Sequence, residues 1–162
     1  MEIKQTIGID ISKLTFDVRI HSNQSYHVFN NSKKGFKSLM LWIDKNNPYP
    51  KEQTLFVLEH TGIYSEQISV FFSEQNIPFT LVPGLEIKKS LGISRGKDDK
   101  VDATKIALYG YRLRDEIKPY LIPLKHISQL KRLLSLRERL VKQRAGYKTS
   151  LKEQRRVYSK TG

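Results

Sequence analysis

The stretch IGIDI at residues 7–11 decides the fold, because it places an acidic residue, Asp10, inside an apolar, strand-like run. A second apolar run, TLFVLE at residues 54–59, ends on Glu59. A charged side chain in or at the end of a buried strand is costly unless it is paired or binds a metal ion. We therefore take Asp10 and Glu59 as candidate functional residues.

The elements predicted around these runs follow a regular order. Three strands at residues 3–11, 14–20 and 26–29 resemble an antiparallel meander. An amphipathic helix follows, capped by Ser32 and ending near residue 46, because its apolar residues recur with helical spacing. Next come a strand at 54–59, a helix at 65–75, a strand at 77–82, a short helix at 86–91 and a helix at 99–113, which offers Val101, Ala103, Ile106, Ala107 and Gly110 for packing.

This element order is that of an RNase H-like fold, in which carboxylates from the first strand, the fourth strand and a late helix converge. We therefore predict an α/β fold with a mixed five-stranded sheet and flanking helices, followed by a long C-terminal helix. Asp99 and Asp102 supply the helix position, because residues three apart project from one face of a helix.

The four carboxylates predict a site for Mg²⁺ or Mn²⁺, because hard divalent cations prefer oxygen ligands. Two such ions about 4 Å apart repel each other, so carboxylates must offset their charge. One ion then activates the attacking oxygen of a phosphodiester reaction, and the other stabilises the leaving oxygen. Asp10 is the natural bridging ligand, whereas Asp98 faces solvent.

Each acidic residue also has a structural interpretation. Asp10 could cap a turn or pair with Lys13, and Glu59 could begin the turn at residues 60–62. Asp99 and Asp102 could simply favour a helix N-terminus through its dipole. The convergence of all four on one set of fold positions favours the metal site.

The positive charge of the chain is concentrated near its C-terminus. Residues 1–124 hold 17 Lys/Arg and 14 Asp/Glu, and residues 125–162 hold 12 Lys/Arg and 2 Asp/Glu, so +10 of the net charge of +13 lies in the last segment. Such a block indicates a polyanionic partner, most often nucleic acid, although a solvated helix face is the alternative. The candidate nucleic-acid contacts are Arg95 and Lys97 in a charged loop, and Lys131, Arg132, Arg137, Arg139, Lys142, Arg144, Lys148, Lys152, Arg155 and Arg156 in the last segment.

One long helix is predicted from about residue 124 to residue 158. Nothing else in the chain covers its apolar stripe, so we expect it to pair with a second copy or with sequence beyond Gly162. The predicted domains are a catalytic domain at residues 1–118 and a basic coiled-coil segment at residues 119–162, which we expect to be truncated. The heptad a and d positions are filled by Leu133, Leu136, Leu140 and Tyr147.

Composition excludes several other classes of protein. The chain has no cysteine, which removes disulfides, thiol catalysis and Cys-ligated zinc. No apolar run approaches the roughly 18 residues of a membrane span. Residues 1–4 lack the apolar stretch of a signal peptide, so we expect a cytoplasmic protein. His60 follows Glu59 but points to the opposite face of the strand, and no histidines show ligand spacing.

Three motifs, taken together and in order, resemble a known family. IGIDISK at residues 7–13, LEHTGIY at residues 58–64 and KDDKVDA at residues 97–103 are similar to the motifs of the DEDD-type insertion-sequence transposases, the IS-one-ten group. The resemblance covers residues 3–111, and Asp98 stands where many relatives carry threonine.

The resemblance implies an N-terminal RuvC-like catalytic domain that uses Asp10, Glu59, Asp99 and Asp102 to hold divalent metal for DNA strand cleavage and exchange. It also implies a connecting coiled coil, a C-terminal domain with a nucleophilic serine beyond Gly162, and a structured guide RNA encoded by the element. The expected partners are therefore DNA, a guide RNA and further copies of the chain, in a nucleoid-associated bacterial or archaeal protein.

Other functions stay open at this point. A junction-resolving nuclease on the same fold would carry a similar site, and DNA cleavage by this domain alone would favour it. A catalytically silent nucleic-acid-binding and dimerisation module would need only the basic helix. An actin-like or sugar-kinase ATPase also begins with a strand Gly-x-Asp, but its second glycine-rich phosphate motif is absent from the sequence.

Overall fold

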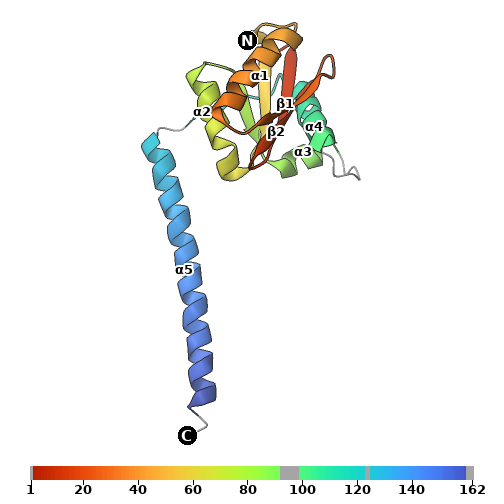
Figure 1. The fold of residues 1–162 in the computed structure, drawn as a ribbon. Coiled ribbons are helices and arrows are strands. Elements are labelled where there is room, and N and C mark those ends of the chain that lie inside the picture. The colour runs from red at the N-terminus through yellow and green to blue at the C-terminus, as the bar shows by residue number, and fades with distance from the viewer. Residues whose placement is uncertain (1, 92–98, 123–124, 160–162) are drawn as a thin grey trace. The chain divides into compact units, whose positions relative to one another are not determined.

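The structure, a computed structural model, describes residues 2–91, 99–122 and 125–159 of the 162-residue chain. Contacts between residues divide the chain into two units, Met1–Ile122 and Pro123–Gly162. The first unit is an α/β fold, and the second consists of one long helix. Figure 1 traces both units from the N-terminus in red to the C-terminal helix in blue.

A five-stranded sheet forms the centre of the first unit, with the strand order β3-β2-β1-β4-β5. β1 (Gln5–Ile11), β2 (Thr15–Ile20) and β3 (Tyr26–Asn30) form an antiparallel meander. β4 (Thr54–Glu59) lies parallel to β1, and β5 (Phe79–Val82) lies parallel to β4. The predicted mixed sheet of five strands is therefore confirmed.

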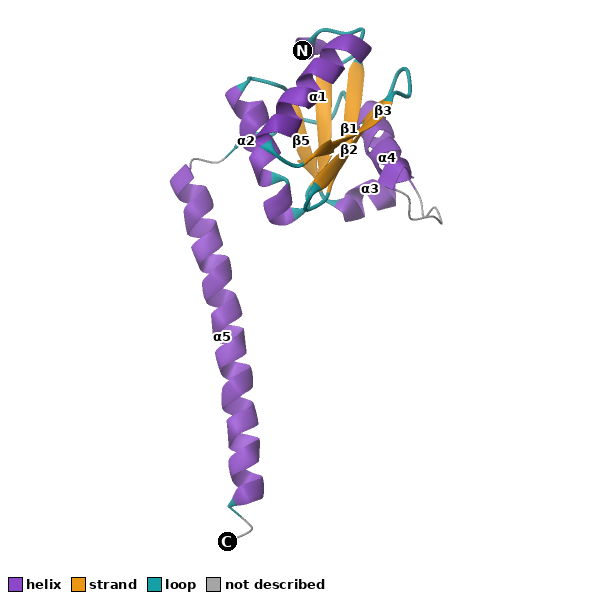
Figure 2. Cartoon of the chain, viewed as in Figure 1, coloured by secondary structure: helices purple, strands orange, loops and turns teal. Residues whose placement is uncertain are grey.

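One face of the sheet packs against α1 (Lys33–Asn46) and α2 (Glu66–Glu74). Alternate strand residues, such as Ile9 and Leu58, are fully buried there, together with Phe72 of α2. Figure 2 shows α1 and α2 together on this side of the strands. The larger of the two apolar clusters of the first unit lies in this layer.

The opposite face packs against α3 (Gly84–Leu91) and α4 (Asp99–Arg112), around a smaller apolar cluster that includes Val57 and Tyr109. The Tyr109 hydroxyl donates a hydrogen bond to Oε1 of Glu86 at 2.8 Å and so joins α4 to α3. Burial, together with this hydrogen bond, raises the pKa of Tyr109 to about 12. Tyr109 therefore keeps its proton, and with it the bond to α3, at neutral pH.

The buried side of α4 differs in one residue from the prediction. Ala103, Ile106, Ala107 and Gly110 are buried as expected, but Val101 is 39% exposed. Ala103 and Ala107 lie one turn apart and define the contact with the sheet. Because successive helix residues turn by about 100°, a residue two positions before Ala103 lies about 200° round the helix and points away from it.

Local signals explain where two other elements begin. Ser32 caps α1 as predicted, because its side chain accepts a hydrogen bond from a backbone N–H of the first turn. β5 begins at Phe79 and not at residue 77, as the sequence had suggested. The N–H of Ile77 bonds back to the carbonyl oxygen of Phe72 at 2.9 Å. Pro78 has no N–H, so pairing with β4 starts one residue later.

Short connections complete the first unit. Two 3₁₀ helices flank β4, η1 (Lys51–Gln53) before it and η2 (Gly62–Tyr64) after it. The chain that follows α4 meets the outer edge of β5, where the N–H of Tyr120 donates to the carbonyl oxygen of Phe79 at 2.6 Å. Part of one sheet edge is thereby kept from pairing with another strand.

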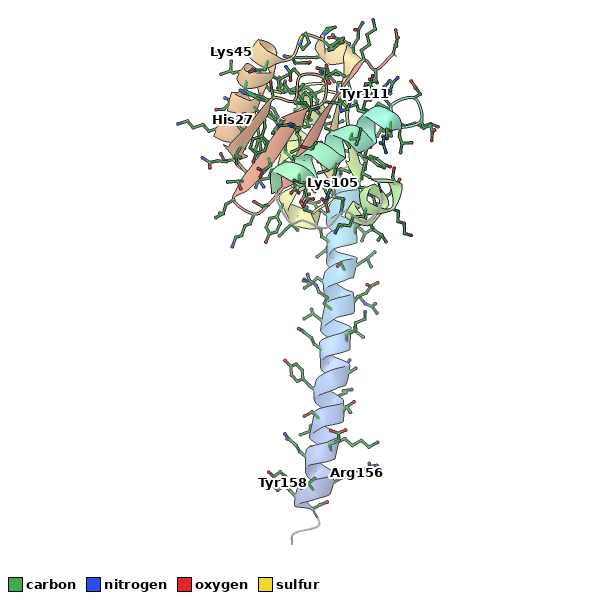
Figure 3. The ribbon with its side chains drawn as sticks, turned by 90° about the vertical axis from the view of Figure 1, so that its right-hand side faces the viewer. His27, Lys45, Lys105, Tyr111, Arg156 and Tyr158 are labelled. Carbon is green, nitrogen blue, oxygen red and sulfur yellow. The ribbon has the colours of Figure 1, made fainter. Side chains whose placement is uncertain are left out.

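The second unit is α5 (Lys125–Tyr158), a helix of 34 residues. Every one of its residues whose burial is described is exposed. Side chains leave the helix in all directions, as Figure 3 shows around Arg156 and Tyr158. The predicted long C-terminal helix is confirmed, whereas its pairing into a coiled coil stays a prediction. Within the described ranges, no helix is both long and apolar enough to cross a membrane.

Candidate active site

Asp10 and Glu59 lie on neighbouring central strands and face the same side of the sheet. The parallel register of β1 and β4 pairs Ile9 with Leu58, so the next step along both strands brings Asp10 beside Glu59. Ile9 and Leu58 are buried against the layer of α1 and α2. Because strand side chains alternate between faces, the two acidic residues point to the α4 side.

α4 packs on β1 with almost no space between the two backbones. A Cβ atom on Gly8 would lie 2.3 Å from the carbonyl oxygen of Ala103 and 2.3 Å from the nitrogen of Ala107. Only glycine allows so close an approach. The Thr6 hydroxyl donates a hydrogen bond to the carbonyl oxygen of Ala107 at 2.8 Å, which fixes the position of the helix along the strand.

This packing carries the first turn of α4 to the end of β1 that bears Asp10. One helical turn of about 5.4 Å nearly matches two strand residues of about 6.6 Å. Ala107 lies over the start of β1 and Ala103 over Gly8, so the preceding turn, which begins at Asp99, reaches Asp10. The side chain of Asp99 itself lies outside the described part of the structure.

The carboxyl group of Glu59 meets residues of both α3 and α4. Its Oε1 atom occupies the space beside Gly84, where an added Cβ atom would lie only 2.1 Å away. Burial raises the pKa of Glu59; the Lys88 ammonium opposes this rise, and the Asp102 carboxylate adds to it. Asp102 is therefore close enough to Glu59 for the two charges to interact. Asp102 also forms an ion pair of 3.3 Å with Lys105, which is labelled in Figure 3.

The described side chains do not form a complete metal centre by themselves. Among them, no three acidic or histidine residues gather closely enough to hold a metal ion. Asp10, Glu59 and Asp102 are therefore not brought together as such a group among the described residues. The donor set still suits Mg²⁺ or Mn²⁺, because it consists of carboxylate oxygens. The raised pKa of Glu59 marks a carboxylate that a bound cation would stabilise.

Asp17 is a further acidic residue of this region, and the sequence alone does not reveal its position beside Asp10. It is the direct partner of Asp10 in the antiparallel register of β1 and β2. Asp17 is only 7% exposed, and the hydroxyl of Tyr26 on β3 donates a hydrogen bond to its Oδ1. The alternation of Phe16, Asp17 and Val18 already signals an acidic residue on one face of a strand. Its place opposite Asp10 depends on the register, which no local pattern contains.

The predicted nucleic-acid contacts fall into two groups. Arg95 and Lys97, together with Asp98, lie outside the described residues. The second group lies along α5, and each of its side chains is exposed: Lys131, Arg132, Arg137, Arg139, Lys142, Arg144, Lys148, Lys152, Arg155 and Arg156. Together these exposed side chains make up the basic surface of α5.

The same helix carries an exposed apolar groove between its basic side chains. Leu133 is 63% exposed, Leu136 44% and Leu140 55%. These leucines line the groove with Val141 and the stems of two arginines. Such a stretch of exposed apolar surface on a helix is typical of an interface. The groove includes three of the four predicted heptad residues, Leu133, Leu136 and Leu140, but not Tyr147.

Residues 7–156 match the sequence model of a transposase family, the DEDD type of the IS110 group. The chain belongs to this family. The match includes the three motifs that carry Asp10, Glu59 and the pair Asp99 and Asp102, and it extends along most of α5. This match confirms the resemblance to the IS110-group transposases that the three sequence motifs indicated.

Solved structures of RuvC are similar to part of this transposase chain. RuvC of Thermus thermophilus in complex with a Holliday junction substrate is 12% identical, with a TM-score of 0.51 over 72% of this chain and 99% of the RuvC chain. A second structure of Thermus thermophilus RuvC is 13% identical, with a TM-score of 0.49 and the same coverage. The first likeness shows the RuvC-like variant of the RNase H-like fold. No curated protein matches the chain.

Proposed function

We propose that the chain carries the catalytic site of a DNA transposase, in which Asp10, Glu59, Asp99 and Asp102 hold Mg²⁺ or Mn²⁺ for the cleavage and exchange of DNA strands. The observation that carries this proposal is the packing of α4 on β1 at Gly8. It brings the acidic first turn of the helix to the ends of the two strands that bear the other carboxylates. Membership in a transposase family supports DNA as the substrate.

The carboxylates have distinct parts in this proposal. Bound divalent ions supply an activated attacking oxygen and stabilise the leaving oxygen of the phosphodiester. Asp10 stands on the central strand β1, the most constrained position, and suits the bridging role. Glu59 and Asp102 would supply the flanking ligands, and the repulsion between these two carboxylates contributes to the raised pKa of Glu59. A cation relieves that repulsion, so the site is arranged to gain free energy when it binds one.

The basic surface of α5 is proposed to bind the nucleic-acid backbone. Its exposed lysines and arginines would contact phosphates of the DNA. Arg95 and Lys97 would hold a phosphate beside the carboxylates. The structured guide RNA that the family resemblance implies is a second polyanion for the same surface. The leucine groove of α5 would pair with a second copy of the chain. We place this activity in the cytoplasm, at the nucleoid.

A catalytically silent nucleic-acid-binding and dimerisation module is the second candidate. One observation favours it: no three of the described acidic or histidine side chains form a group of the size a metal ion needs. This candidate requires only α5 and predicts that the carboxylates contribute nothing to cation binding. The two candidates therefore differ in what happens when Asp10 loses its charge.

Titration of Mn²⁺ into the chain distinguishes these candidates. Calorimetry of the chain with a short DNA duplex, corrected for Mn²⁺ binding by the duplex alone, should show a site that Asp10→Asn abolishes. Asp115→Asn, at an exposed position beyond α4, removes the same charge and should leave the site intact. Equal Mn²⁺ binding by the chain and by Asp10→Asn would contradict the metal site. Cleavage of a four-way DNA junction by the chain alone would instead favour a junction-resolving nuclease.

A further inference from the structure

Each of the two carboxylates proposed as flanking ligands has a lysine beside it. Asp102 of α4 forms an ion pair of 3.3 Å with Lys105, which lies about one turn further along the same helix. The carboxyl group of Glu59 lies against α3, because its Oε1 atom fills the space beside Gly84. Lys88 follows Gly84 by four positions and therefore lies on the same face of α3. The Lys88 ammonium is one of the charges that act on Glu59.

The two lysines come from one helix layer of the first unit. α3 and α4 pack around the same apolar cluster on one face of the sheet. The Tyr109 hydroxyl of α4 donates a hydrogen bond of 2.8 Å to Oε1 of Glu86 on α3, which joins the two helices. Lys88 is exposed, and the side chains of Lys105 and Asp102 are 25% and 37% exposed. A phosphate group that approaches the carboxylates from solvent can therefore reach both lysines.

Lysines at these two positions suit a phosphate substrate better than they suit a metal ion alone. A partly exposed ion pair between residues three apart on a helix contributes little to stability. Beside a metal ligand, an ammonium group weakens the binding of a cation, because the two positive charges repel each other. Lysine is, however, a common binder of phosphate, to which it brings a point charge on a flexible stem. The substrate of the proposed reaction is a phosphodiester, whose negative charge the two lysines would neutralise.

We propose that Lys88 and Lys105 exchange partners: they offset the charges of Glu59 and Asp102 in the metal-free chain, and they bind the phosphate oxygens of the DNA strand once these carboxylates hold a divalent cation. The inference rests on the proposed function, because it assigns both lysines to the same site. The long, flexible stem of each lysine allows the ammonium group to turn from the carboxylate to the phosphate. Both lysines bind phosphate without coordinating the metal.

Mn²⁺ binding in the absence of DNA tests the first half of this exchange. The whole chain is titrated with Mn²⁺, and the electron paramagnetic resonance of free Mn²⁺ gives the affinity. Lys88→Gln and Lys105→Gln each remove one competing positive charge, so each variant should bind Mn²⁺ about threefold more tightly, the effect of one partly exposed charge pair. Lys45→Gln, at an exposed position of α1 in the other helix layer, removes the same charge and should leave the affinity unaltered (Figure 3).

DNA binding at saturating Mn²⁺ tests the second half. Fluorescence anisotropy with a short DNA duplex is recorded over a range of salt concentrations. Each Gln variant should bind the duplex more weakly, and its slope of log affinity against log salt concentration should be shallower by about one, as for the loss of one phosphate contact. In EDTA, where the lysines stay with the carboxylates, the slopes of the variants and of the unchanged chain should agree. Lys105→Arg keeps the charge and should bind Mn²⁺ and DNA like the unchanged chain.

The outcomes separate this inference from the proposed function. If Asp10→Asn leaves Mn²⁺ binding unaltered, the proposed metal site itself is wrong. If Asp10→Asn abolishes binding but both lysine variants behave like Lys45→Gln, only the role of the lysines is overturned. Tighter Mn²⁺ binding without any change in DNA binding contradicts the phosphate contact and overturns that role as well. Should Lys105→Gln fail to fold, Lys88→Gln decides alone, because its position is exposed.

Discussion

Gly8 of β1 lies directly beneath Ala103 of α4, so close that a single methyl group between them would fall 2.3 Å from the helix carbonyl oxygen. Both partners at this contact are backbone atoms, which cannot turn aside as a side chain does. The contact therefore sets the height of α4 above the sheet and, with it, the place of the acidic first turn.

Gly8→Ala should destabilise the first unit by at least about 2 kcal/mol, because the added methyl group meets backbone atoms on a packed face. Denaturant unfolding followed by the fluorescence of Trp42, the single tryptophan, measures this. Gly146→Ala on α5 is the matched control, since nothing lies within 4 Å of its added Cβ atom. Alanine favours a helix, and Gly146 lies in the second unit, so the control should leave the unfolding of the first unit unaltered. Equal stability of the two variants would contradict the close contact.

Gly84→Ala should affect function more than stability. The added Cβ atom would fall 2.1 Å from Oε1 of Glu59, the flexible end of a side chain, which can move aside. We expect the free energy of unfolding to change by less than about 1 kcal/mol, while Mn²⁺ affinity falls because the carboxylate has left its place. Calorimetry and denaturant unfolding of the same variant check both halves. A large loss of stability with normal Mn²⁺ binding would show that Glu59 is not held as described.

The pKa of Glu59 predicts a pH dependence of stability in the absence of metal. Burial raises this pKa above its ordinary value of 4.5, so the folded chain holds the proton to higher pH than the unfolded chain does. The contribution of Glu59 to stability then falls as pH rises from 4.5 through the folded pKa. Glu59→Gln cannot ionise, so its stability relative to the unchanged chain should increase over this window. Parallel pH profiles of the two proteins would exclude the predicted shift.

Removal of α5 should abolish most nucleic-acid binding. Neutralising about six phosphates gives a slope near −5 in a plot of log affinity against log salt concentration on duplex DNA. Fluorescence anisotropy with the chain and with a variant lacking residues 125–162 measures both affinity and slope. If the deletion leaves the affinity and the slope as they were, the basic surface of α5 is not the binding surface.

Polar substitution of the leucine groove should prevent self-association. Replacing Leu133, Leu136 and Leu140 together by Gln keeps the helical propensity of α5 and removes its exposed apolar seam. Repulsion between two basic helices opposes pairing, but screening over about 10 Å at 0.1 M salt weakens it. Sedimentation velocity should show a dimer for the unchanged chain and a monomer for the variant. A chain that is monomeric at high micromolar concentration would contradict the dimer.

The strands and helices could be predicted largely because their signals are local. The run at residues 54–59 became β4 with the predicted bounds, since it is apolar throughout and ends on a charged residue. Prediction was less accurate where one residue overrides a pattern, as Pro78 does at the start of β5. Val101 was misplaced because its apolar character, without the packing of Ala103, does not tell which side of α4 meets the sheet.

The residues of the candidate site differ in how far the sequence predicts their positions. The approach of Asp10 to Glu59 follows from the strand order of the fold, which the element order already implies. The place of Asp17 needs the antiparallel register of β1 and β2, and a slip of one residue would turn it to the other face. The hydrogen bond from Tyr26 joins separate strands, so no spacing within either strand contains it.

The hydrogen bond from Thr6 to Ala107 joins residues that are 101 positions apart. On the ribosome, where a chain grows by about 5–20 residues per second, β1 must wait roughly five to twenty seconds for the helix that covers its second face. The meander and α1 can form in that interval, because they lie within the first 46 residues. The acidic face of β1 is therefore completed only at the end of translation of the first unit. A partly synthesised chain would accordingly lack the assembled form of the proposed site until the first unit is complete.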